Sequence, residues 1–406
     1  MLCVPTPVQA RESAMTVPRS AARTHSRPSP YLCRRADPFP APHKIPLAFF
    51  ATNGVMRCTA RRSHRETDGP YQRMQQRVAQ QVRAALDVPR GYEILFMQGG
   101  AHAQFAAVPL NLLGTPQGPE RQASASVDTG FWARRAAKEH AKYARVTWAA
   151  KAEQFSSVPH EQQWQLTGNE SYVHICANET IEGLEYLRDP DLSHLGYRAP
   201  PIAADFTSTL LSRPVDISKY GVVYCSGGKN LGPAGLTLVI VREDLLTDHL
   251  EHPFCPAILS YRSLARSQPI PNIYATPPTF NVYMLGLVLE HLQAKGGVSQ
   301  ASVDAEWRAA LVYNTIEASK GFYTNKVVAE SRSRMSVPFR ISGGRAPADA
   351  LALEQTFLKQ MEAAGFRHLA GHPLHGGVRA SLYHGVPNDS VLALVAFMER
   401  FQKRHQ

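Results

Sequence analysis

Short apolar runs that end in glycine or polar residues recur along the chain, and they constrain its fold more than any other feature. The runs do not alternate between apolar and polar residues, so as strands they would be buried on both faces. Helical patterns lie beside them, as in "YQRMQQRVAQQVRAALDV" (71–88) and "AHAQFAAVPLNLLG" (101–114). We therefore predict an α/β sheet covered by helices on both faces. The runs are "YEILFMQGG" (92–100), "YVHICANET" (172–180), "IAADFTSTL" (202–210), "YGVVYCSGG" (220–228) and "LTLVIVRED" (236–244).

The pattern changes at about residue 300, where helices mix with short strands such as "RSRMSVPFRIS" (332–342) and "GGVRASLYH" (376–384). This change indicates a second, smaller α+β domain. We predict three parts: a disordered extension or transit peptide over 1–48, a large domain over 49–297, and a small C-terminal domain over 298–406.

The positive charge of the chain is concentrated at its N-terminus. Of the net charge of +11, residues 1–65 carry +9, and the other 341 residues carry only +2. A nearly neutral body gives no argument for a nucleic-acid partner. Residues 1–48 are rich in Arg, Ser, Ala and Pro and poor in acids, which is typical of an organelle transit peptide. The alternatives are a disordered tail or a wrongly predicted first exon.

The remaining composition indicates a soluble globular protein. No apolar run approaches the roughly 18 residues that a membrane helix needs. The six cysteines are scattered and form no C-x-x-C pair, so neither a metal site nor a disulfide framework is indicated. We expect a reducing compartment, which is the cytoplasm or, if residues 1–48 are a transit peptide, a plastid or mitochondrion.

Lys229 is the most informative single residue, because it lies in the glycine-rich loop "CSGGKNLGPAG" (225–235) after an apolar run. Most lysines are solvated surface charges. A phosphate-binding Walker loop is excluded, because Val223 and Asn230 occupy the places of its Gly and its Ser or Thr. A nucleophilic role needs partners at the same edge of the sheet, since ligands bind beyond the carboxyl ends of parallel strands.

Such partners follow three other runs. Gly99 and Gly100 open a helix, whose N-terminus favours an anion. Asp205 ends a run 24 residues before Lys229, and Trp132 follows a probable strand in "DTGFWARRA" (128–136). Separately, these residues could be a turn, a strand-end cap and core packing. Together with the lysine they are the parts that hold pyridoxal phosphate.

From about Ser63 to the C-terminus the chain resembles the phosphoserine aminotransferase family, in class V of the pyridoxal-phosphate-dependent aminotransferases. The resemblance is carried by "SHRE" (63–66), "NET" (178–180), "SRPVDISKYG" (212–221), "KNLGPAGLT" (229–237), "TPPTF" (276–280) and "GHPLHGGVRASLY" (371–383). It implies fold type I, with a mainly parallel seven-stranded sheet in the large domain and a smaller C-terminal α+β domain. It also implies a homodimer with active sites at the interface.

The same resemblance implies a reaction in serine biosynthesis, in which an amino group moves from L-glutamate to 3-phosphohydroxypyruvate. The products are O-phospho-L-serine and 2-oxoglutarate. Lys229 would be the catalytic residue, which forms the Schiff base and moves a proton between the substrate α-carbon and C4′ of the cofactor. The implied cofactor-binding residues are Ala101, His102, Trp132, Thr180, Asp205, Gly228, Lys229 and Thr276.

Each implied residue has an expected role. Asp205 pairs with the pyridinium, and Trp132 stacks on the ring. The backbone at Ala101 and His102 receives the cofactor phosphate, helped by Thr276 of the neighbouring subunit. In the substrate site, Arg379 is expected to bind the carboxylate, since arginine reads carboxylates bidentately. The residues expected around the substrate phosphate are His64, Arg65 and His372.

The chain also departs from the family pattern. We find no F-x-x-G-P-A segment near the N-terminus. Gly228 stands where the family has a glutamine, and Ala275 where it has an asparagine. Pro373 stands in place of an arginine of the substrate-phosphate site, and His375 would partly compensate for that arginine. Two alternatives therefore stay open: a class V aminotransferase for another 2-oxo acid, and a non-catalytic paralogue or incomplete gene model.

Overall fold

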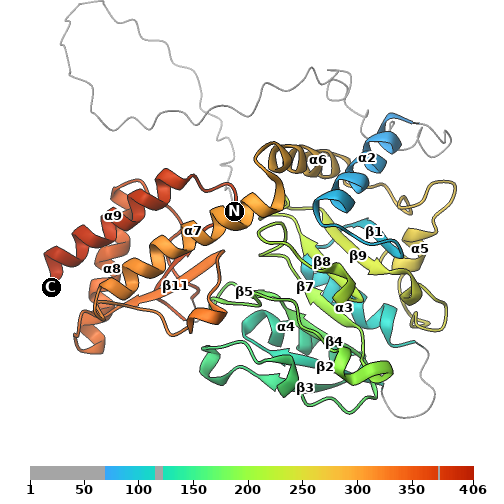
Figure 1. The fold of residues 1–406 in the computed structure, drawn as a ribbon, viewed down its shortest axis with the longest axis horizontal. Coiled ribbons are helices and arrows are strands. Elements are labelled where there is room, and N and C mark those ends of the chain that lie inside the picture. The colour runs from blue at the N-terminus through green and yellow to red at the C-terminus, as the bar shows by residue number, and fades with distance from the viewer. Residues whose placement is uncertain (1–68, 115–121, 374) are drawn as a thin grey trace, which may run out of the picture. The chain divides into compact units, whose positions relative to one another are not determined.

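The computed structural model describes residues 69–114, 122–373 and 375–406 (Figure 1). Its largest element is a seven-stranded sheet with the order β1-β9-β8-β7-β4-β2-β3. Strand β9 is antiparallel to both of its neighbours, and the other pairs are parallel, so the predicted mainly parallel sheet is confirmed. The strands are β1 (Tyr92–Met97), β2 (Ala123–Asp128), β3 (Arg145–Lys151), β4 (Glu170–Cys176), β7 (Ile202–Asp205), β8 (Val222–Ser226) and β9 (Thr237–Arg242).

Helices cover both faces of this sheet, which explains why its strands do not alternate. Successive strand residues point to opposite faces. In β1, Ile94 packs in a core with α2 and α6, whereas Leu95 packs in a second core with α3 and α5. The helices are α2 (Pro70–Ala85), α3 (Gly100–Leu112), α4 (Phe131–His140), α5 (Tyr261–Ala265) and α6 (Thr279–Ala294). The helices predicted at 71–88 and 101–114 are thus α2 and α3.

The C-terminal part has its own core. Helix α7 (Gly297–Ala318) leads into an antiparallel sheet of β10 (Tyr323–Thr324), β11 (Ser336–Ile341) and β12 (Val378–Ser381). Helices α8 (Pro347–Ala363) and α9 (Asn388–His405) lie in the same C-terminal part as this sheet (Figure 1). They share a core with it that includes the buried residues Phe339, Phe357 and Phe401. This is the expected α+β unit, while the boundaries 48/49 and 297/298 stay predictions.

Smaller elements connect these units. A two-stranded hairpin, β5 (Asn178–Glu179) and β6 (Leu184–Glu185), follows β4. No helix of the described segments is both long and apolar enough to cross a membrane. The short 3-10 helices are η2 (Glu153–Phe155), η3 (Glu161–Gln163), η4 (Ser193–Arg198), η5 (Ile217–Lys219), η6 (Glu243–Leu245) and η7 (Ala329–Ser331).

Candidate active site

The predicted site residues of the large domain gather because the strands that precede them are parallel. Strands β2, β4, β7 and β8 end at the same edge of the sheet, and β1 runs in the same direction. The segments that follow these strands carry Gly100, Trp132, Thr180 and Lys229, while Asp205 is itself the last residue of β7. The sheet edge therefore brings together side chains that are far apart in sequence.

Asp205 is a buried carboxyl group at this edge. Its Oδ1 accepts the backbone N–H of Thr207 at 2.8 Å. Burial raises the pKa of Asp205, while the bonds from Thr207 and the charges of Lys229 and His102 act in the opposite direction. A buried carboxyl in this state is stabilised as an anion by a cationic partner.

Lys229 lies on the loop between β8 and β9, partly exposed. Two backbone hydrogen bonds close the loop. The N–H of Gly228 donates to the carbonyl of Gly232 at 2.6 Å, and the N–H of Gly232 donates to the backbone carbonyl of Lys229 at 3.1 Å. Gly228 has a φ of 102°, which L side chains rarely adopt. Glycine adopts this conformation without strain. The Lys229 ammonium lies 6.0 Å from the ring centroid of Tyr383.

The N-terminus of α3 forms a cradle for an anion. The first N–H groups of a helix have no acceptor within the helix, and Ala101 and His102 occupy its first turn. The N–H of Gly100 donates to Oγ1 of Thr237 at 2.9 Å. A Cβ atom at Gly100 would lie 3.2 Å from Oγ of Ser226. The hydroxyls of Ser226 and Thr237 were missed in the sequence, although both lie at strand ends beside the loop of Lys229.

Trp132 lies between this cradle and the hairpin. Its indole Nε1–H donates to Oγ1 of Thr180 at 2.9 Å. The ring centroids of Trp132 and His102 are 6.0 Å apart, with the rings edge to face. Three predicted cofactor residues therefore contact one another in the described structure.

Arg379 of β12 extends the site to the C-terminal part. Its Nη1–H donates to the carbonyl of Thr180 at 3.2 Å. Its Nε is buried and has no hydrogen-bond partner in the described structure. A buried N–H without a protein partner indicates that a water molecule or a ligand accepts its hydrogen bond.

His372 lies in the loop before β12, with its ring centroid 5.2 Å from that of Phe131 and 6.4 Å from that of His375. Burial, Arg379 and His375 lower the pKa of His372, in that order of size. Pro373, beside it, is exposed. The other residues predicted around the substrate phosphate, His64 and Arg65, lie outside the described residues.

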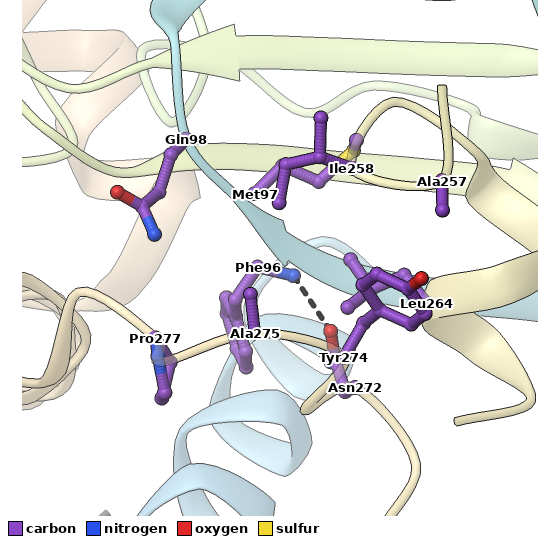
Figure 2. Close-up of a pocket in the computed structure, with 10 residues that line it drawn as sticks. All are labelled: Phe96, Met97, Gln98, Ala257, Ile258, Leu264, Asn272, Tyr274, Ala275 and Pro277. Carbon is purple, nitrogen blue, oxygen red and sulfur yellow. Dashed lines mark hydrogen bonds between the residues drawn. The ribbon is translucent and has the colours of Figure 1, made fainter. Parts of the chain in front are cut away.

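Thr276 lies near the end of β1, where its carbonyl accepts Nε2–H of Gln98 at 3.1 Å. The two residues flanking Thr276 line a pocket shown in Figure 2, together with the end of β1 and residues 257, 258 and 264. In this pocket the N–H of Phe96 donates to Oδ1 of Asn272 at 2.9 Å (Figure 2). Thr276 thus contacts Gln98, which lies two positions before the first residue of α3. The expected binding of the cofactor phosphate by Thr276 of a neighbouring subunit stays a prediction.

Two buried glutamates were missed in the sequence. Glu179 accepts the N–H groups of Trp132 at 2.9 Å and of Ala133 at 2.7 Å, and Glu182 accepts that of Phe131 at 3.0 Å. The two acids lie in the mixed stretch "ANETIEGLEY" (177–186), which gives no local sign that their carboxyl groups are buried. Helix α4 is too far away in sequence for the contact to be predicted.

The residues present fit pyridoxal phosphate by the chemistry of their groups. The α3 N-terminus offers N–H donors to a phosphate, and beside it lies the hydroxyl of Ser226, which in this structure donates to the carbonyl of Gly227 at 3.2 Å. Asp205 offers a buried carboxyl group to a cationic ring nitrogen. Lys229 offers an amine close enough for its charge to lower the pKa of Asp205. Among the described residues the Nε of Arg379 has no hydrogen-bond partner, so its N–H suits an anionic ligand.

Comparison with known proteins identifies the family. Residues 55–394 match the class-V aminotransferases, and the chain belongs to that family. A phosphoserine aminotransferase of Pseudomonas aeruginosa is 40% identical over 345 residues, which are 84% of this chain and 89% of the relative. Within the class-V family, the chain therefore belongs with the phosphoserine aminotransferases.

Solved structures agree. The phosphoserine aminotransferase of Bacillus circulans subsp. alkalophilus superposes with a TM-score of 0.75 at 37% identity, over 84% of this chain and 89% of that one. The pyridoxal-phosphate-bound enzyme of Trichomonas vaginalis superposes with a TM-score of 0.73 at 29% identity, over 86% and 97%. The predicted family, fold type, transaminase class, cofactor and function in serine biosynthesis are confirmed, and the protein is a pyridoxal-phosphate-dependent transaminase.

Proposed function

We propose that this site exchanges an amino group between L-glutamate and 3-phosphohydroxypyruvate, giving O-phospho-L-serine and 2-oxoglutarate. The observation that carries the proposal is the position of Arg379. It contacts the carbonyl of Thr180, whose side chain holds the Trp132 indole, and its buried Nε has no partner in the described chain. An unused guanidinium donor beside the cofactor residues suits a substrate carboxylate, which all four reactants carry.

Each residue has a role that its surroundings support. Pyridoxal phosphate, when bound, withdraws electrons from the substrate α-carbon. The Lys229 amine would take the proton from the substrate α-carbon and deliver it to C4′ of the cofactor, and would carry a proton in the opposite direction when the second substrate receives the amino group. The Asp205 carboxylate keeps the ring nitrogen protonated, since a buried anion favours a neighbouring cation. Trp132 packs on the ring, and the N–H groups of Ala101 and His102 bind the cofactor phosphate.

The substrate phosphate is proposed to lie beside His372 and His375, with His64 and Arg65 also serving it. His372 is near Arg379, whose charge contributes to the lowered pKa of this histidine. A phosphate dianion would favour the charged form of His372. Pro373 offers neither charge nor N–H, which favours weaker phosphate recognition than an arginine would give.

A substrate comparison tests the proposal. Purified protein loaded with pyridoxal phosphate is assayed with L-glutamate and each of 3-phosphohydroxypyruvate, glyoxylate and pyruvate, and kcat/KM is measured. We expect 3-phosphohydroxypyruvate to be favoured. A preference for an unphosphorylated acid would support the alternative that Pro373 motivates, and cofactor binding without turnover would support a non-catalytic paralogue.

We also propose a homodimer. Phe254, Ile258 and Tyr274 are exposed to 84%, 53% and 50%, and the last two line the pocket beside Thr276 (Figure 2). Large exposed apolar side chains near one another favour a covering partner. Ile258→Asp should shift the mass measured by light scattering from dimer to monomer, whereas Val303→Asp, on the exposed side of α7, should not. A monomeric wild type would contradict the proposal.

Finally, we propose that residues 1–48 direct the protein to a plastid or mitochondrion. The support is their composition, which is rich in Arg and Ser and poor in acids. These residues lie outside the described ranges. A fusion of residues 1–48 to a fluorescent protein tests the proposal, and a uniform cytosolic signal would contradict it.

A further inference from the structure

Two buried glutamates cap the helix that carries Trp132. Glu179 and Glu182 expose 0% and 5% of their surface. Their carboxyl groups accept the N–H groups of residues 131–133, which are the first three of α4. The positive end of a helix dipole stabilises negative charge at this position. The pair thus holds the backbone of Trp132.

The same pair is tied to the side chain of Trp132. Thr180 lies between the two glutamates in sequence, and its Oγ1 accepts the indole Nε1–H at 2.9 Å. The N–H of Trp132 itself donates to Oε2 of Glu179 at 2.9 Å. Because one short turn contacts both the backbone and the ring of Trp132, a shift of that turn would move the ring.

The two carboxyl groups crowd one point. A Cβ atom at Gly130 would lie 2.4 Å from Oε2 of Glu182 and 2.9 Å from Cδ of Glu179. Oε2 of Glu182 is buried and has no hydrogen-bond partner in the described structure. Two buried carboxylates that both lie against Gly130 do not readily ionise together. Burial raises the pKa of both groups, and the charge of Glu182 further raises that of Glu179, to about 8.

Other titratable groups face the pair from several elements. Cys176, Tyr186 and Asp205 lie near Glu179, and each is neutral or negative. The cations Arg134 and Lys326 lie near Glu182, and Nε2 of His375 is 3.9 Å from its Oε1. One negative charge on the pair is therefore balanced by neighbouring cations and by the helix, whereas a second would repel the first across Gly130.

We infer that Glu179 and Glu182 hold one proton between them, and that this singly charged pair positions Trp132 and Thr180 for cofactor binding. The inference rests on the proposed function, in which Trp132 packs on the cofactor ring. Loss of the shared proton at alkaline pH leaves two buried charges, which separate and displace the turn that holds the indole. Glu179 and Glu182 are positioning residues and set the alkaline limit of cofactor affinity.

The test measures the Kd of the apoprotein for pyridoxal phosphate by equilibrium dialysis between pH 7 and pH 9. In the wild type we expect affinity to fall across this range. Glu182→Gln keeps an acceptor for Phe131 but cannot add a second charge, so its affinity should change far less with pH. Glu179→Gln replaces the acceptor for Trp132 with an amide, so its affinity should be roughly 10-fold or more lower at every pH. Every other facing group is the same in the wild type and in Glu182→Gln.

Two outcomes would overturn the inference. One is a pH dependence in Glu182→Gln equal to that of the wild type, and the other is a wild-type Kd in Glu179→Gln. Circular dichroism of each apoprotein checks folding, and if Glu179→Gln does not fold, the Glu182→Gln comparison still decides. Trp132→Ala separates the two proposals. A wild-type Kd in this variant would contradict the ring contact of the proposed function. Weakened binding in this variant, together with wild-type binding in both glutamate variants, would contradict only the inference about the glutamates.

Discussion

At the scale of single residues, the candidate site combines groups that can react or bind, such as Lys229 and Asp205, with groups such as Glu179 that hold the backbone around them. Lys229, Asp205 and Trp132 could be found because amine, carboxyl and indole groups followed recognisable strand ends. Ser226 and Glu179 could not, because their partners Gly100 and Trp132 lie more than forty residues away in sequence and meet them only after folding. Polar groups that serve a site through backbone contacts have no local pattern of their own.

Asp205→Asn is expected to stabilise the apoprotein while reducing turnover. Burial raises the pKa of Asp205, so the folded apoprotein holds this proton more tightly than the unfolded chain. Its stability therefore falls as pH rises above the ordinary aspartate range, and the asparagine variant lacks this loss. Urea unfolding should show a more stable variant at pH 7 and a smaller difference near pH 4. Turnover should fall about 10- to 150-fold, from the loss of a charge-assisted contact. Wild-type turnover would contradict the role of Asp205.

Lys229→Ala is expected to abolish transamination and covalent attachment of the cofactor. In the wild type, borohydride treatment should leave the cofactor on the peptide that contains residue 229, as located by mass spectrometry. The variant should lose this label and all measurable turnover, because no other amine is proposed to reach the substrate α-carbon. Lys403→Ala, on the exposed side of α9, is the matched control and should retain both. A label that persists on the variant would move the assignment to another lysine.

At the scale of elements, the apolar pattern and the length of each run predicted most of the helices and strands of the large sheet. The buried runs became β1, β4, β7, β8 and β9, and the helical patterns became α2 and α3. Strand β2 has the small, polar sequence "ASASVD" and β3 the sequence "RVTWAAK", so neither forms an apolar run. Their strand structure depends on pairing with each other and with β4, which is tertiary information.

The loop of Lys229 depends on two adjacent glycines for different reasons. A Cβ atom at Gly227 would lie 2.2 Å from the carbonyl oxygen of Pro233, whereas one at Gly228 would meet nothing closer than 3.7 Å. Gly227→Ala should therefore open the loop, with a cost of roughly 1–3 kcal/mol and a weaker Kd for pyridoxal phosphate. Gly228→Ala is the matched control. It has the backbone strain of a φ of 102° but no collision, so it should disturb the packing of the loop less. Equal cofactor affinities in both variants would contradict this difference.

At the scale of the whole molecule, the candidate site is assembled from two packed units. Arg379 arrives on β12 of the C-terminal sheet, while Lys229 and Asp205 lie at the edge of the seven-stranded sheet. Their meeting could be expected only from the family resemblance, because no local pattern links residues so distant in sequence. A buried ion pair helps to hold the two units together, since Arg334 before β11 binds Glu185 of β6 at 2.6 Å.

Arg334→Ala is expected to destabilise the protein strongly. Glu185 is fully buried and accepts from the backbone and side chain of Arg334 and from Oγ1 of Thr209. Removing the arginine would leave a buried charge without its cation, at a cost of about 3–5 kcal/mol in the free energy of unfolding. Asp244→Ala removes the partner of Arg242 in an exposed pair and should cost at most about 1 kcal/mol. Urea unfolding measures the free energy of unfolding of both variants. Similar losses would contradict the larger contribution expected of the buried pair.

Pro373→Arg tests how the C-terminal loop contributes to substrate choice. Proline supplies neither charge nor N–H, and it is exposed next to His372, which lies near Arg379. An arginine here would add one charge-assisted contact to the substrate phosphate, worth roughly 1.5–3 kcal/mol, or about a 10- to 150-fold gain in affinity. Steady-state titrations should therefore show a lower KM for 3-phosphohydroxypyruvate and a nearly unchanged KM for L-glutamate, whose carboxylate is read by Arg379. An arginine that changes neither KM would mean that residue 373 does not face the substrate phosphate, and the phosphate site would then have to be sought around His64 and Arg65.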